Sequence, residues 1–375
     1  MKLYNTLTGN IEELIPFEEK NIRMYVCGIT PYDTTHLGHA FLYTFFDALN
    51  RYLRYKGYNV TYVQNVTDID DDILKRAKLQ NRDWKELGQF WTDKFVNDLK
   101  ALNILMPEHY VKATDSIQTI IKMTNGLVNN GFAYEVDGTI FFRVRKFPEY
   151  GKLSTFTPDE MLVLSRERGA NPEDPRKEYG LDFILWQKSI EGEPGWSSPW
   201  GQGRPGWHIE CSAMVQQYLG QQIDIHGGGR DLVYPHHEGE IAQSESFNQK
   251  KPYVKTWMHA AMLMYQGEKM SKSLGNLIMV SDLLKSYSPD VIRWVLLSHH
   301  YRTPWEFFAR ELDEAQKSVD KITGVISTAG TTEDKSLVTK FKELMDNDMQ
   351  AEKVLELLKD SPSKEIFTTL GFTVG

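Results

Sequence analysis

The first part of the chain alternates between short runs rich in β-branched and aromatic residues and a longer stretch of helical periodicity. Residues 22–27 are typical of a short strand, and they lead into a turn over residues 28–33. Residues 37–56 have the spacing of an amphipathic helix that ends at Gly57, and residues 59–66 form a second β-branched run. A strand, a helix and a strand within about 45 residues predict a βαβ unit and a parallel sheet.

The pattern changes further along the chain. An acidic turn at 68–72 suits the N-terminus of a helix better than a metal site, and helical periodicity then continues to about Leu102. Another helix is predicted over 116–129. From about 131 to 203, short strand signals among many glycines and prolines indicate an irregular insertion.

Sheet-like segments return at 223–226 and 257–264, and the pattern beyond Ser273 is helical to the end apart from a Gly/Thr-rich break at 330–332. The length of 375 residues allows two domains, and the 41% apolar and 25% charged residues are those of an ordinary globular protein. No apolar run approaches the roughly 18–20 residues of a membrane span, and Met1–Asn5 does not begin a signal peptide. We therefore expect a cytoplasmic protein without membrane contact.

The formal net charge of −8 does not indicate nucleic-acid binding by the whole surface, but a net charge does not exclude a local basic groove. Two short motifs indicate the binding of a nucleotide triphosphate. Thr35-His36-Leu37-Gly38-His39 opens the predicted helix after the first strand, where imidazoles and a helix N-terminus can approach a nucleotide triphosphate. Lys269-Met270-Ser271-Lys272-Ser273 offers two lysines that can neutralise charge developing at its α-phosphate.

Either motif alone arises by chance, and the lysine motif alone is more often a solvated loop. In this order in one chain, they resemble the two ATP signatures of class I aminoacyl-tRNA synthetases. The resemblance implies that His36 and His39 bind the triphosphate and adenosine, and that Lys269 and Lys272 stabilise the pyrophosphate charge, with Lys272 the preferred catalytic lysine. The implied ATP-binding set is His36, Gly38, His39, Asp231, Lys269, Ser271 and Lys272.

The two cysteines, Cys27 and Cys211, are not expected to form a disulfide in a cytosolic protein. Cys27 ends the first strand beside the first motif. His236 and Glu240 are four residues apart and would share one face of a helix. Two thiolates, an imidazole and a carboxylate make a tetrahedral zinc set, although cysteines so far apart define no spacing and two buried thiols are the usual alternative.

A wider resemblance, from about Leu3 to Trp305, is to cysteinyl-tRNA synthetases and to the related cysteine ligases of mycothiol synthesis. It implies that Cys27, Cys211, His236 and Glu240 hold one zinc ion, which selects the thiol of cysteine over the hydroxyl of serine. The segments that carry it are 24–28, 65–71, 203–212, 226–232, 235–238 and 267–273.

The resemblance implies that L-cysteine is activated by ATP with Mg²⁺ to cysteinyl-adenylate and pyrophosphate, and that the cysteinyl group passes to the 3′ end of tRNA(Cys). Gly28, Thr67 and Trp207 would bind cysteine, although Trp207 is equally a core residue by its position in the pattern. Asp231 follows three glycines and would contact the adenosine ribose, with a simple turn aspartate as the alternative.

The implied fold is α/β, a Rossmann-like parallel-sheet catalytic domain over residues 1–302. An insertion would occupy about 113–205, and the second ATP-motif loop and a linker about 265–302. A short α-helical C-terminal domain would cover 303–375. A monomer is expected.

Two features favour a different acceptor. The turn over 28–33 is closer to the mycothiol ligases, and the sequence stops at Gly375, short of the anticodon-binding region usual in the synthetases. Glu240, which the mycothiol ligases lack, favours the synthetases. The leading hypothesis is a compact cysteine–tRNA ligase; the alternative is a ligase that joins cysteine to glucosaminyl-inositol, and a non-enzymatic paralogue is disfavoured because both ATP motifs are intact.

Overall fold

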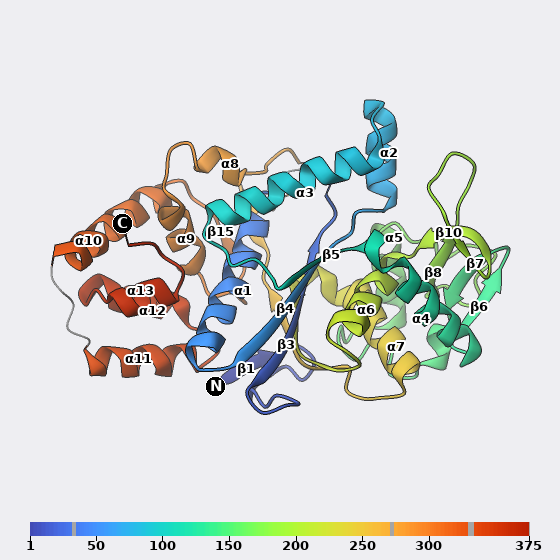
Figure 1. The fold of residues 1–375 in the computed structure, drawn as a ribbon, viewed down its shortest axis with the longest axis horizontal. Helices are drawn as coiled ribbons and strands as arrows, with labels where there is room; N and C mark the ends of the chain where they lie inside the picture. The colour runs from blue at the N-terminus through green and yellow to red at the C-terminus, as the bar shows by residue number, and fades with distance from the viewer. Residues whose placement is uncertain (32–34, 271–273, 329–333, 375) are drawn as a thin grey trace.

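A parallel sheet forms the centre of the molecule. The computed structural model describes residues 1–31, 35–270, 274–328 and 334–374. The sheet has five strands in the order β12-β11-β3-β4-β5, all parallel (Figure 1). Its strands are β3 (Asn21–Ile29), β4 (Asn59–Val66), β5 (His109–Lys112), β11 (Ile223–Gly229) and β12 (Val254–Ala260).

The strand order reverses between β3 and β11. From β3 the chain passes through α1 (Leu37–Tyr55) to β4 on one side, and from β11 it passes through α7 (Glu238–Asn248) to β12 on the other. The carboxyl ends of β3 and β11 therefore form a topological switch point, where ligands of open α/β sheets bind. The α/β prediction and the predicted βαβ unit are confirmed, including the end of α1 before Gly57, whose φ is +86°.

Alternate residues of the strands belong to two different cores. In β3, Met24 and Val26 pack into one buried cluster, whereas Tyr25 and Cys27 pack into the other. The first cluster contains side chains of α1, and the second contains two of the predicted metal ligands, Cys27 and Cys211. Further helices on the two faces are α3 (Trp84–Ala101) and α9 (Pro289–Leu297) in the first cluster, and α4 (Ile117–Asn129) and α6 (Trp207–Tyr218) in the second.

Between β5 and α6 the chain forms a second sheet, antiparallel, with the strand order β6-β7-β8-β10-β9. The short strand signals predicted in this range are confirmed as strands of three to six residues, whereas the expectation that the segment as a whole is irregular was wrong. The elements are β6 (Ala133–Val136), β7 (Thr139–Phe142), α5 (Pro158–Glu167), β8 (Phe183–Lys188), β9 (Trp196–Ser198) and β10 (Gly201–Pro205).

The helix predicted to run on to Leu102 is two helices, α2 (Asp71–Gln80) and α3. Asn81 adopts a left-handed conformation with φ 49° and ends α2. Glycine is the usual residue at such a helix end, and asparagine is the residue that most often replaces it. The acidic turn does begin a helix, since the side chain of Asp70 accepts a hydrogen bond from the backbone N–H of Ile73.

Beyond the second motif the described chain is helical apart from β15 (Trp305–Glu306), which pairs in parallel with β13 (Leu263–Tyr265). The prediction of a helical pattern was wrong at this short strand, and the predicted break at 330–332 lies outside the described residues. Side chains of the last helices join the same buried cluster as α1, and the division of the chain at residue 303 stays a prediction. The remaining strands and α-helices are β1 (Lys2–Asn5), β2 (Asn10–Glu13), β14 (Glu268–Lys269), α8 (Val280–Leu283), α10 (Arg310–Thr328), α11 (Lys335–Met345), α12 (Ala351–Asp360) and α13 (Lys364–Thr369). Short 3₁₀ helices lie at Ala113–Ser116, Val144–Lys146 and Arg230–Leu232, and a π-helical turn lies at Val233–His237.

No helix in the described ranges has both the length and the hydropathy that crossing a membrane requires.

Candidate active site and metal centre

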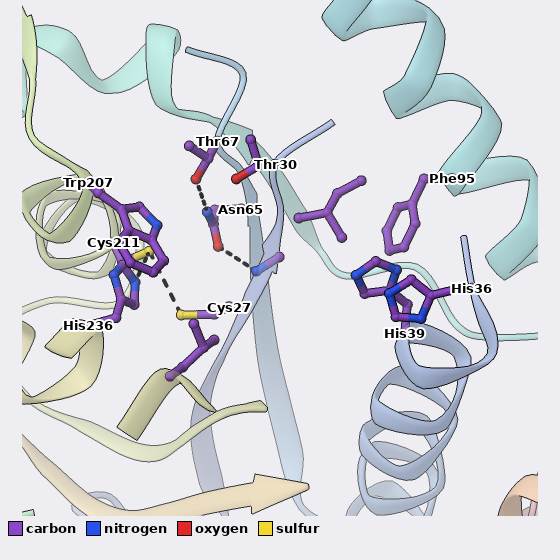
Figure 2. A pocket seen from close by; sticks show the side chains of 13 residues that line it. Cys27, Thr30, His36, His39, Asn65, Thr67, Phe95, Trp207, Cys211 and His236 are labelled. Atoms are coloured by element: carbon purple, nitrogen blue, oxygen red, sulfur yellow. Dashed lines mark hydrogen bonds between the residues drawn. The ribbon is translucent and has the colours of Figure 1, made fainter. Parts of the chain in front are cut away.

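A cavity of about 240 Å³ opens at the switch point of the parallel sheet (Figure 2). It brings the first ATP motif together with both cysteines, although they come from distant parts of the chain. Its lining residues are Cys27, Gly28, Ile29, Thr30, His36, His39, Asn65, Thr67, Phe95, Trp207, Cys211, Leu232 and His236.

The first motif lies at the N-terminus of α1, as predicted from its place after a strand. The side chain of His36 caps the helix by accepting a hydrogen bond from the N–H of Gly38 through Nδ1, at 3.1 Å. The His36 and His39 rings stack with their centroids 3.8 Å apart. Because the dipole of a helix favours an anion at its N-terminus, this end of the cavity suits a phosphate.

The first motif is tied to the segment that follows the second. The N–H of Leu37 donates to the carbonyl of Ile278 at 2.8 Å, and the N–H of Val280 donates to the carbonyl of Thr35 at 3.0 Å. These two backbone bonds place the start of α1 and the residues after the lysine motif side by side.

The wall between the two ends of the cavity is a short network around Asn65. The N–H of Gly28 donates to Oδ1 of Asn65 at 2.7 Å, and Nδ2 of Asn65 donates to Oγ1 of Thr67 at 3.3 Å. A Cβ atom on Gly28 would lie 1.6 Å from the carbonyl oxygen of Asn65. Only glycine therefore fits at this point of the wall.

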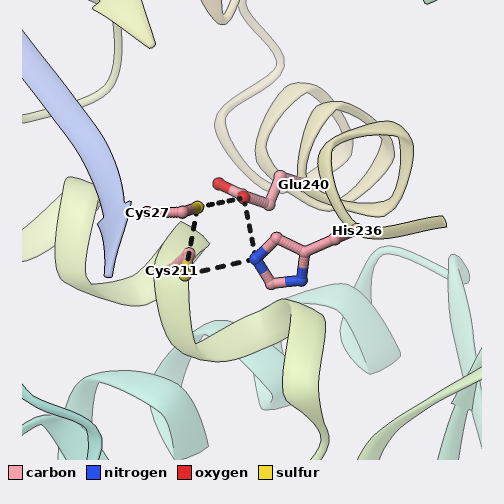
Figure 3. A group of neighbouring side chains, drawn as sticks. All are labelled: Cys27, Cys211, His236 and Glu240. Carbon is pink, nitrogen blue, oxygen red and sulfur yellow. Dashed lines mark hydrogen bonds and ion pairs between the residues drawn. The ribbon is translucent and has the colours of Figure 1, made fainter. Parts of the chain in front are cut away.

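The four predicted metal ligands converge from four elements (Figure 3). Sγ of Cys27 lies 3.9 Å from Sγ of Cys211 and 3.7 Å from Oε1 of Glu240. Nε2 of His236 lies 3.3 Å from Sγ of Cys211 and 3.2 Å from Oε1 of Glu240. Ligands at about 2.0–2.3 Å from zinc stand roughly 3.3–3.8 Å apart in a tetrahedron, so the spacing of these atoms suits one ion.

Burying these polar groups together without a cation is energetically unfavourable. Cys27 is 3% exposed, Cys211 1% and Glu240 0%. Burial raises the pKa of both thiols, and the neighbouring Cys211 raises that of Cys27 further. The pKa of His236 is lowered by burial, so its imidazole is neutral and available as a ligand. This donor set fits a soft divalent metal.

Trp207 covers the cluster from the cavity side. Its ring stacks on His236 with centroids 4.5 Å apart, and it stays 37% exposed. Of the two readings of this residue, the cavity wall is therefore the one that the structure supports.

Comparison with known proteins agrees with this arrangement. Residues 13–317 match the family model of the class I (C) tRNA synthetase catalytic domain. A cysteine–tRNA ligase of Dehalococcoides mccartyi is 46% identical over 368 residues, which cover 96% of this chain and 79% of the relative. One of Thermodesulfovibrio yellowstonii is 44% identical over 381 residues, covering 96% and 77%.

The chain belongs to the cysteinyl-tRNA synthetase family. This family is part of the class I aminoacyl-tRNA synthetases, which are ATP-dependent ligases. Solved structures confirm the fold class. A Mycobacterium tuberculosis methionyl-tRNA synthetase in complex with methionyl-adenylate aligns with a TM-score of 0.66 at 15% identity, covering 94% of this chain and 88% of that one. A putative arginyl-tRNA synthetase from Campylobacter jejuni gives 0.60 at 15% identity, covering 96% and 94%.

In this cysteinyl-tRNA synthetase family member, two predicted ATP-binding residues bind each other. Nζ of Lys269 lies 3.3 Å from Oδ2 of Asp231, which also faces Nη1 of Arg168 at 3.8 Å. Neither Lys269 nor Asp231 lines the cavity. The roles of both residues stay predictions, and Ser271 and Lys272 lie outside the described residues.

The sequence did not predict the histidines that surround the metal ligands of this family member. Nε2 of His226 lies 2.9 Å from Oε2 of Glu240, and Nε2 of His237 lies 3.3 Å from Sγ of Cys27. His208 reaches Nδ1 of His236 with its own Nδ1 at 3.0 Å, and burial lowers the pKa of His208 to about 3. His226 and His237 also form, with Cys27 and Glu240, a second group whose donor atoms lie close enough for one ion, and a histidine that does not bind the metal can fix the orientation of a ligand. Histidines that flank a predicted ligand, as His237 flanks His236, are the signal that was available.

Proposed function

We propose that the protein is a cysteine–tRNA ligase, which activates L-cysteine with ATP and passes the cysteinyl group to the 3′ end of tRNA(Cys). The observation that carries the proposal is that one cavity holds the stacked histidines of the first ATP motif and the Cys27–Cys211–His236 face of the metal cluster. The names of the relatives support the same reaction.

In the first step, a carboxylate oxygen of cysteine attacks the α-phosphorus of ATP, the bond to the β-phosphate oxygen breaks, and pyrophosphate leaves. His36, His39 and the N-terminus of α1 position the phosphates, and Lys269 and Lys272 neutralise charge on the leaving pyrophosphate, together with Mg²⁺. The ion pair of Lys269 with Asp231 must open for Lys269 to take this role, because the pair lies outside the cavity lining.

In the second step, a ribose hydroxyl of the tRNA attacks the carbonyl carbon of the adenylate, and AMP leaves with its electron pair. No side chain forms a covalent bond to the substrates in either proposed step, so catalysis depends mainly on positioning the reacting groups.

Substrate choice depends on the metal cluster. Zinc held by Cys27, Cys211, His236 and Glu240 supplies a soft Lewis acid that prefers a thiolate to a hydroxyl. Trp207, Thr67 and Gly28 complete the walls beside the thiol, and Gly28 leaves no space for a larger side chain of its own. A pocket shape alone separates cysteine poorly from serine, which differs by one atom.

The test measures two reactions of the purified protein. ATP–pyrophosphate exchange is followed with cysteine, and with serine as the matched control. AMP release is then followed in the presence of ATP, cysteine and either tRNA(Cys) or glucosaminyl-inositol. We expect exchange with cysteine at least about 10³-fold above serine, since a metal–thiolate contact contributes several kcal/mol, and AMP release that depends on tRNA.

Exchange without cysteine specificity would remove the role of the metal cluster in selection. Turnover with glucosaminyl-inositol and none with tRNA would replace the proposed acceptor with the amino sugar and leave the activation step standing.

A further inference from the structure

Both cysteines of this 375-residue chain lie in the candidate metal cluster, and both are free thiols. Cys27 belongs to β3 and Cys211 to α6. Their sulfur atoms are 3.9 Å apart, too close for another atom to lie between them (Figure 3). All cysteine chemistry of the chain is therefore confined to the cluster that the proposed function uses to select the substrate thiol.

The two sulfurs are more accessible than those of a structural metal site. In a structural site, four protein ligands close around the ion. Here Cys27, Cys211 and His236 form part of the wall of a cavity that the substrate has to enter. A cavity that admits cysteine also admits a smaller oxidant such as hydrogen peroxide, and thiolates, the form of cysteine that binds metals, are also the form that peroxides oxidise.

The backbone at Cys27 leaves room for the two sulfurs to approach further. The register of β3 with β11 extends only to Val26, and the register with β4 is irregular between Val26 and Ile29. An irregular ladder constrains the chain less than a continuous one. A disulfide needs its sulfurs about 2.0 Å apart, so a modest shift of Cys27 toward α6 is enough to form the bond.

We propose that Cys27 and Cys211 form a reversible disulfide when the protein meets a peroxide, and that the cluster then loses its metal ion. One thiolate of the pair attacks an oxygen of hydrogen peroxide, so that an S–O bond forms, the O–O bond breaks and hydroxide leaves. The second sulfur attacks the first, an S–S bond forms, the S–O bond breaks and a second hydroxide leaves. With the two thiol protons, these become two water molecules.

The disulfide removes two of the four candidate ligands. Only His236 and Glu240 remain of the set that faces the cavity, and the sulfurs of a disulfide no longer carry the negative charge with which a thiolate binds zinc. The ion is therefore released. This step needs no substrate, and it depends only on the two sulfurs and the metal.

The reverse reaction needs a small thiol, and the substrate of the proposed function is one. The thiolate of a cysteine attacks one sulfur of the disulfide, which forms a mixed disulfide and frees the other protein sulfur. A second cysteine attacks the mixed disulfide, and cystine leaves. This part of the inference rests on the proposed function, because it makes the ligase active only while its own substrate is in the reduced form.

The experiment treats the full chain, loaded with zinc and freed of added thiols, with a small excess of hydrogen peroxide. A chromogenic chelator follows zinc release, and peptide mapping without reductant identifies the disulfide. L-Cysteine and fresh zinc are then added, and the initial rate of pyrophosphate exchange is compared before oxidation, after oxidation and after this recovery. Cys27→Ala and Cys211→Ala each keep one sulfur, whereas the matched control Ser212→Ala keeps both.

We expect wild type and Ser212→Ala to release about one zinc ion per chain and to give a linked pair of peptides that contain Cys27 and Cys211. The initial exchange rate should fall at least about 10-fold and return to within about 2-fold of its first value after recovery. The single-cysteine variants should give no intramolecular link and should gain oxygen at the remaining sulfur, up to products that thiols do not reduce.

Zinc release without linked peptides, or a loss of exchange that cysteine and zinc do not restore, would overturn the proposed disulfide. If thermal melting shows that the single-cysteine variants do not fold, wild type and Ser212→Ala decide by the linked peptides and the zinc release alone. A wild type that forms the bond reversibly but does not activate cysteine would refute the proposed function and leave the disulfide standing.

Discussion

Two buried polar sites lie on opposite faces of the parallel sheet, and they handle charge in different ways. On the face of α1, the guanidinium of Arg293 is 0% exposed and pairs with Asp47. Its Nε donates to the carbonyl of Leu370 at 2.7 Å and its Nη1 to that of Leu102 at 3.2 Å. Asp47 also accepts hydrogen bonds from Arg51 and from the N–H of Leu105, each at 2.8 Å.

On the other face, Cys27, Cys211 and Glu240 are as deeply buried, but no arginine or lysine stands among the described groups at the cluster. The imidazoles of His226, His236 and His237 lie within 4.0 Å of the Glu240 carboxylate. Burial lowers the pKa of His236 and His237 and keeps them neutral. The first site supplies its own counter-charge, whereas the second has donors for a cation that the protein does not provide. A buried charge without a partner is unfavourable by several kcal/mol, so this difference indicates which of the two sites could hold a metal ion.

The largest effect is expected from removing a ligand of the second site. Cys211→Ala should reduce metal affinity by on the order of 10³-fold, since one of four ligands is lost from a site that binds by its complete set. Metal content by mass spectrometry checks this, with Ser212→Ala on the same helix as control. Full metal content in Cys211→Ala would contradict the ligand assignment.

Breaking the first site should cost stability and leave the metal in place. Arg293→Met should lower the free energy of unfolding by about 3–5 kcal/mol, because Asp47 would stay buried without its main partner. Urea denaturation measures the change. Arg166→Met, which removes the exposed pair with Glu173, is the control and should unfold like wild type. Loss of metal from Arg293→Met would show that the two sites are coupled through the sheet.

A smaller effect is expected from the groups that orient the metal ligands. His226→Asn should weaken metal binding by about 10- to 100-fold with little loss of fold, because the contact at 2.9 Å that holds Glu240 in place is altered. Competition with a chromogenic chelator gives the affinity, with the exposed His109→Asn as control. An unchanged affinity would mean that Glu240 is positioned by its other neighbours.

The local sequence predicted the elements that have strong periodicity. The β-branched run over 59–66 is strand β4, and the helix before Gly57 is α1. The antiparallel sheet was missed because short strands carry little pattern of their own, even where neighbouring segments pair, as β6 and β7 do across Asp137 and Gly138. The break at Asn81 was missed because one asparagine within a helical pattern does not by itself specify a left-handed conformation.

The candidate site was predicted by different means. His236 and Glu240 were predicted on one helix; His236 instead lies in the turn Val233–His237 directly before α7, and Nε2 of His236 is still 3.2 Å from Oε1 of Glu240. The approach of Cys27 to Cys211 depends on the whole sheet, and only resemblance to a family could indicate it. The positions of Asn65 and of the histidines around the metal ligands depend on packing between β4, β11 and α7, which a single sequence does not specify.

The two ends of the chain are bound to each other. Tyr4 donates its N–H to Oδ1 of Asp348 at 2.8 Å across a separation of 344 residues, and Asp348 also receives Tyr301 at 2.7 Å and Nη2 of Arg302 at 2.6 Å. During synthesis at about 5–20 residues per second, the first strand would wait roughly 20–70 s before this partner leaves the ribosome. Its contact with Asp348 therefore forms late, whereas its pairing with β2 (Asn10–Glu13) can form as soon as both strands have left the ribosome.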